Sequence, residues 1–89
     1  MSDEEIAARG RAALSEMART SEAFELLKQQ YVKAWMNTPA EATDAREKLY
    51  QAIRVMDDVW SNLRQMVNDG KLADSEIARI AEQQKVKNG

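Results

Sequence analysis

The sequence predicts an all-α protein of one domain, an antiparallel helical hairpin with shorter terminal helices that assembles into a helical bundle. Three observations predict this fold class. Strong helix formers dominate the 89 residues, and only one proline and three glycines interrupt them. Apolar residues recur at steps of three and four rather than in alternation. One loop-forming segment, residues 37–43, separates the two longest helical patterns, and helices joined by a short loop are usually antiparallel neighbours.

The first helix is expected over about residues 3–19. Ser2 and Glu5 have the capping-box spacing, in which a hydroxyl and a carboxylate satisfy free backbone N–H groups. A thin stripe of apolar or small residues then follows at helical spacing: Ile6, Gly10, Ala13 and Met17.

A second helix is expected over residues 21–37, after a kink near Thr20 and Ser21, because either hydroxyl could cap a new helix. The alternative is one long helix to about Asn37, because the heptad phase continues through this point. The two possible capping hydroxyls favour the kink, whereas the continuous heptad phase favours the single helix. The kink is the preferred interpretation.

The strongest pattern predicts a helix over residues 44–69. Pro39 marks the loop before it, because proline removes a backbone donor and disfavours helical geometry at the preceding residue. Six apolar residues step by about four and three along this helix, as in a heptad seam: Leu49, Ile53, Met56, Trp60, Leu63 and Val67. Gly70 is expected to end the helix as a C′ glycine. A last short helix is expected over residues 75–85, with fraying over residues 85–89.

Enzymatic chemistry is not expected, and neither is a cofactor or metal. The chain has no histidine and no cysteine, so the commonest general base, the thiolate nucleophile and the common zinc ligands are missing. Asp57 and Asp58 are neighbours in a predicted helix, where they point about 100° apart. They are therefore interpreted as part of a solvated acidic face.

Nucleic-acid and membrane binding are both disfavoured by the sequence. Arg9, Arg11 and Arg19 form a local basic cluster, but Glu16 and Glu22 dilute it and no aromatic residue interleaves it. The net charge of -2 gives no general attraction to polyanions, and no apolar run has the length of a membrane span. The acidic N-terminal residues do not resemble a signal peptide, so a cytoplasmic location is expected.

A surplus of apolar surface on the 44–69 helix is the main functional clue. On a helical wheel, the heptad seam is widened on one side only, by Ala52, Val55, Val59 and Met66. A two-helix hairpin covers a narrower stripe than this. These four residues, with Trp35 at the edge of its helix, are therefore the candidate interface, and a dimer or larger homo-oligomer is expected.

Several spaced residues resemble a group of short uncharacterised helical proteins encoded by tailed phages and prophages. The resemblance covers roughly residues 20–75 and rests on a pattern without a catalytic motif: Ala23-Phe24, Trp35 with Thr38-Pro39, Ala45 to Tyr50, and Asn68 to Ala73. It implies a small helical accessory protein of phage origin, acting inside the host cell. It carries over no functional residues.

The expected function is that of a non-catalytic interaction or assembly protein, as an accessory in phage particle assembly or DNA packaging. An inhibitor that binds and blocks a host protein is the alternative, because small size and absent chemistry fit it equally well. A nucleic-acid-binding module based on the three arginines is the least favoured.

Overall fold

The computed structural model describes the backbone of residues 1–88 and the side chains of residues 1–85. Two helices make up almost all of this part of the chain, α1 over Asp3–Asn37 and α2 over Thr43–Asn88, and there is no strand within it. The predicted all-α fold class is confirmed for the described residues. The expected fraying of residues 85–89 is not seen as far as Asn88, and Gly89 lies outside the described residues.

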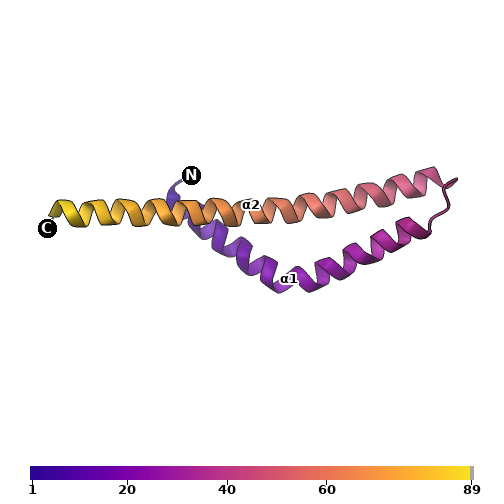
Figure 1. Ribbon diagram of the computed structural model, residues 1–89, viewed down its shortest axis with the longest axis horizontal. Helices are drawn as coiled ribbons and strands as arrows, with labels where there is room; N and C mark the ends of the chain where they lie inside the picture. The colour runs from indigo at the N-terminus through magenta and orange to yellow at the C-terminus, as the bar shows by residue number, and fades with distance from the viewer. Residues whose placement is uncertain (89) are drawn as a thin grey trace.

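Helix α1 begins at the predicted cap and is not interrupted at Thr20. The Ser2 hydroxyl accepts a hydrogen bond from the backbone N–H of Glu5 at 3.2 Å. The separate helices expected over 3–19 and 21–37 are one helix, although α1 changes direction near its middle (Figure 1). Thr20 turns its hydroxyl back to the carbonyl of Glu16 at 2.7 Å, a contact that bends helices without ending them. The hydroxyl taken as a cap therefore acts inside the helix.

The connection between the helices lies where Pro39 predicts it. Helix α1 ends at Asn37, and the Thr38 backbone N–H donates to the carbonyl of Trp35. Arg46, from the first turn of α2, donates to the carbonyls of Trp35 and Thr38 at 3.2 and 2.9 Å. These bonds satisfy carbonyls that the end of a helix leaves free, and they join the loop to both helices.

Helix α2 passes through Gly70, contrary to the expected stop at residue 69 and restart at residue 75. No residue of the described chain has a positive φ, so Gly70 does not adopt the left-handed geometry of a C′ glycine. Its role is to let α1 approach. A Cβ placed on Gly70 would lie 2.7 Å from the Cα of Gly10, and a Cβ on Gly10 would lie 2.7 Å from the Cα of Gly70.

The two helices run antiparallel in a single layer (Figure 1). Their contacts pair rising residue numbers in α1 with falling ones in α2: Arg11 with Asp74, Phe24 with Trp60, and Lys28 with Asp57. The molecule measures 72 × 21 × 15 Å, and its radius of gyration is 20.1 Å. A compact chain of this length would have a radius of gyration of about 12 Å. The fold is therefore elongated, and no third element covers either broad face of the described layer.

The best-packed part of the fold is the place where the helices cross near their glycines. Every buried residue of the described chain lies there: Ala7, Gly10, Ala13, Val67, Gly70 and Ala73. We call this set the glycine crossing. The expected terminal helices at the open end of the hairpin are thus replaced by the first turns of α1, packed directly on the continuous α2. Beyond the crossing, α2 projects past the start of α1 (Figure 1).

Candidate interaction surface

An exposed apolar ridge lies on α2, on the flank that the sequence marked as surplus. Val55, Val59 and Met66 are 60%, 45% and 37% exposed, and Ala52 is half-buried beside them. Their spacing places them on one face of the helix. The heptad seam from Leu49 to Val67 is less exposed, because it faces α1. We call Ala52, Val55, Val59 and Met66 the ridge.

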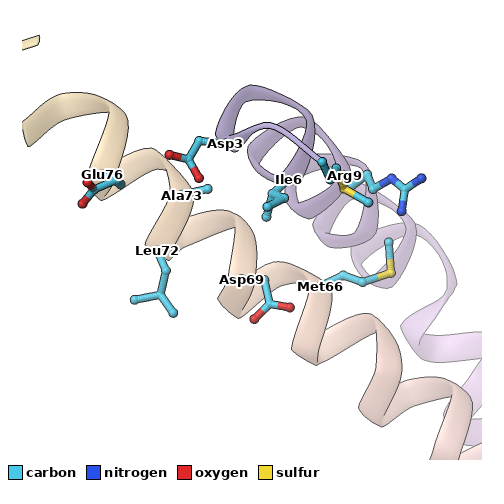
Figure 2. Close-up of a pocket in the computed structure, with 9 residues that line it drawn as sticks. Asp3, Ile6, Arg9, Met66, Asp69, Leu72, Ala73 and Glu76 are labelled. Carbon is cyan, nitrogen blue, oxygen red and sulfur yellow. The ribbon is translucent and has the colours of Figure 1, made fainter. Parts of the chain in front are cut away.

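The ridge leads into a groove at the glycine crossing. The groove has a volume of about 560 Å³, and Ile6, Met66, Leu72 and Ala73 give it an apolar lining. Figure 2 shows Ile6 from α1 and Met66 from α2 on its two sides. Met66 belongs to both the ridge and the groove, so the two form one continuous apolar surface. Leu72, at 70% exposure, extends that surface along α2.

The rim of the groove is mainly acidic. Asp3, Asp69 and Glu76 line it together with Arg9. The hydrogen bond from Arg79 to Glu76, with their charge attraction, lowers the pKa of the Glu76 carboxyl. The lowered pKa means that the Glu76 carboxylate is ionised near neutral pH. The rim adds polarity around an apolar floor, which is the usual build of a protein interface.

Trp35, the other predicted interface residue, is engaged within the chain. The guanidinium of Arg46 lies over its ring, 4.5 Å from the ring centre, as a cation–π contact. The indole is half-buried beside the loop between the helices. The structure thus places Trp35 at the closed end of the molecule, well away from the groove.

The arginines considered for nucleic-acid binding do not form one basic patch. Arg11 pairs with Asp74 across the helices at 3.2 Å, and Arg19 pairs with Glu16 at 2.6 Å. Arg9 lines the acidic-rimmed groove. Phosphate binding would have to compete with carboxylates at each of these positions.

Of the two adjacent carboxylates of α2, Asp57 and Asp58, the first forms an ion pair with α1. Asp57 pairs with Lys28 of α1 at 2.7 Å, and its hydrogen bond and charge raise the pKa of the lysine.

Within the described residues, no three His, Cys, Asp or Glu side chains are grouped so that they could hold a metal ion. In the same part of the chain, neither helix has a stretch long and apolar enough to cross a membrane.

Sequence reasoning found the ridge but missed the groove. Ile6 belongs to the thin stripe of the first predicted helix, and Leu72 lies between the two predicted helices that are one continuous α2. Gly10 and Gly70 were the available signal, because two glycines at helix-interior positions are costly unless something needs close backbone approach.

The chain matches no protein-family model, and no curated protein and no solved structure is similar to it.

Proposed function

We propose that this protein is a non-catalytic assembly protein that associates with itself through the ridge and the groove. The main support for this proposal is the large solvent-accessible surface of a single chain. The accessible surface is 6919 Å², whereas a compact monomer of 10.1 kDa would expose about 5,300 Å². The difference, roughly 1,600 Å², lies within the range of about 1,000–2,500 Å² that each partner buries in large homodimer interfaces.

The location of the exposed apolar side chains supports the same proposal. The layer is a single pair of helices, so the ridge has no covering element in the described chain. Soluble monomers usually avoid long contiguous apolar patches. Packing two such layers face to face would produce a four-helix bundle with two-fold symmetry, the commonest arrangement of homo-oligomers.

A role as an accessory in phage particle assembly or DNA packaging follows from the resemblance to short phage proteins together with this self-association. Helices that present an apolar face are suited to assembly, and the absence of histidine and cysteine leaves little for catalysis. The acidic rim of the groove makes the protein a poor direct ligand for DNA, so its contacts in such a particle would be to protein.

The experiment is a solution mass by light scattering at about 100 μM, on the unmodified chain and two variants. The unmodified chain should have twice the monomer mass. Val59→Glu should reduce the mass to that of the monomer, because an ionised carboxylate would be buried in the interface without a partner. Ser61→Glu adds the same side chain about 160° away around α2, and it should leave the dimer intact.

A monomeric mass for the unmodified chain would overturn the proposal. The ridge and groove would then be the docking site for a different protein, as the inhibitor alternative requires. An unchanged dimer for Val59→Glu would show that self-association uses another face.

A further inference from the structure

Five residues of α2 follow one line along the helix at intervals of about seven residues. Seven residues turn an α-helix through about 700°, so each residue at this spacing is offset by about 20° from the one before it, and the five together span about 80° around the helix. The line begins in the ridge, crosses the floor of the groove and ends on the part of α2 that projects beyond α1: Ala52, Val59, Met66, Ala73 and Ile80. We call it the outer line.

The outer line is distinct from the heptad seam that packs on α1. Val59, Met66 and Ile80 are 45%, 37% and 40% exposed. Ala52 is half-buried, and Ala73 is buried from the side by α1 but still lines the open groove. All five residues are apolar, and four of them, all but Ala73, keep exposed or half-exposed side chains. The line therefore has the composition and spacing of a second helix-packing surface.

The sizes of these side chains are complementary about Met66: each small residue on one side lies at the same distance from Met66 as a larger one on the other side. A small residue, Ala52, stands at one end of the line and a large one, Ile80, at the other. Val59 lies between Ala52 and Met66, and the smaller Ala73 lies between Met66 and Ile80. If the line is reversed about its midpoint, each alanine meets a larger aliphatic residue, and Met66 meets itself.

This complementarity distinguishes between possible arrangements of two α2 helices. A parallel pairing would set alanine against alanine and isoleucine against isoleucine, which leaves gaps at some levels and crowding at others. An antiparallel pairing centred on Val59 would cover Ala52 and Met66, but it would leave Ile80 beyond the start of the partner's α2. Centring on Met66 covers the whole line.

We propose that a second copy of the chain packs antiparallel on α2, with the two-fold axis passing at Met66. This inference rests on the proposed self-association and adds its register. Val59 of each chain then fills the groove of the other above Ala73, and Ile80 packs over Ala52. The contact runs from residue 52 to residue 80, about 42 Å along the helix. The projecting end of α2 thereby acquires a partner that its own chain does not supply.

Single cysteines can test this register cleanly, because the natural chain has none. Two packed helices lie about 8–10 Å apart between axes, and Cα atoms lie about 2.3 Å from each axis. Residues on the two-fold axis therefore come within the Cα separation of a disulfide, about 4.4–6.8 Å. Two copies of Val59 would instead lie about 20 Å apart along the helix.

The experiment oxidises separate single-cysteine variants and measures the covalent dimer by denaturing electrophoresis. Met66→Cys should convert almost completely to a disulfide dimer. Val59→Cys and Ala52→Cys alone should remain mostly monomeric under the denaturing conditions. An equal mixture of Ala52→Cys and Ile80→Cys should give a mixed dimer that neither variant forms alone.

Light scattering of each reduced variant separates failure of the register from failure of self-association. A dimeric mass with no cross-link for Met66→Cys would overturn the register and leave the proposed function standing. Strong cross-linking of Val59→Cys, or of Ala52→Cys alone, would do the same by indicating another axis or a parallel pairing. A monomeric mass for the unmodified chain would overturn both proposals.

Discussion

The same two helices meet through small residues at one place and through aromatic residues at another. At the glycine crossing, Gly10 and Gly70 bring the backbones so close that neither could carry a Cβ without movement. In the middle of the molecule, Phe24 and Trp60 stack with ring centres 5.0 Å apart. The crossing buries its residues, whereas both aromatic rings stay half-exposed.

This difference shows that side-chain size, more than apolar content, sets the distance between the two helices. Small residues permit close approach and burial but contribute little apolar area of their own. Large residues contribute area but hold the helices apart, so solvent reaches their edges. Neither region gives the chain a large core of its own, and only four apolar residues are buried in the described structure: Ala7, Ala13, Val67 and Ala73.

The largest effect is expected from the aromatic middle. Trp60→Ala removes the ring that stacks on Phe24, and Leu63→Ala shortens the next residue of the same seam. Each change should lower the free energy of unfolding by about 2–5 kcal/mol, towards the lower end for half-exposed sites. Urea unfolding followed by circular dichroism measures this. Arg54→Ala, on the solvent side of α2, is the control and should be nearly neutral. Equal losses for Arg54→Ala and Trp60→Ala would show that the seam is wrongly assigned.

An intermediate effect is expected at the crossing, and its sign is informative. Alanine is a better helix former than glycine by about 1 kcal/mol, so Gly70→Ala should stabilise an isolated helix. Here the added methyl would meet the backbone of Gly10, which cannot swing aside as a flexible side chain could. Gly70→Ala should therefore lower stability by about 1–3 kcal/mol.

Ser61→Ala introduces the same residue at an exposed helical position and should be neutral or slightly stabilising. If Gly70→Ala also proved stabilising, the close crossing would not exist in solution, and Gly70 would be an ordinary weak point of a helix.

The smallest effect is expected from the ion pair beside the aromatic stack. The hydrogen bond and charge of Asp57 raise the pKa of Lys28 above its usual 10.5. A raised lysine pKa contributes stability that is fully present below 10.5 and is lost as the pH rises through the folded-state value. Asp57→Asn should lower the Lys28 pKa, as measured by NMR titration of the side chain, with little change in stability at pH 7 because the pair is exposed. An unchanged Lys28 pKa would mean that the pair does not form.

Much of the fold could be predicted from local sequence signals. The Ser2 cap, the loop at Pro39 and the inward face containing Trp60 each depend on residues close together in the chain, and each was found where expected. Phe24 of α1 stacks on Trp60 within this face. Leu27, three residues after Phe24, is 45% exposed.

The wrong predictions of helix ends concern residues whose local pattern is compatible with two different structures. Gly70 after a long helix has the pattern of a C′ stop, but it is also what a close helix crossing requires. Only Gly10, sixty positions earlier, decides between them, and no local rule connects the two. Thr20 likewise has the chemistry of a cap, and its hydroxyl instead bonds back to Glu16 within the helix. The groove depends on the same long-range contact, so it could not be predicted.

We propose that one chain buries too little apolar surface to be stable alone and that a second copy supplies the missing packing. Thermal unfolding by circular dichroism, at chain concentrations from about 1 to 100 μM, tests it most directly. If folding is coupled to association, Tm must rise with concentration by mass action. We expect a steady rise in Tm across this range, and a much smaller one for Val59→Glu, which should also melt at a lower temperature. A Tm that is the same at 1 and 100 μM, with a monomeric mass at both, would contradict the account.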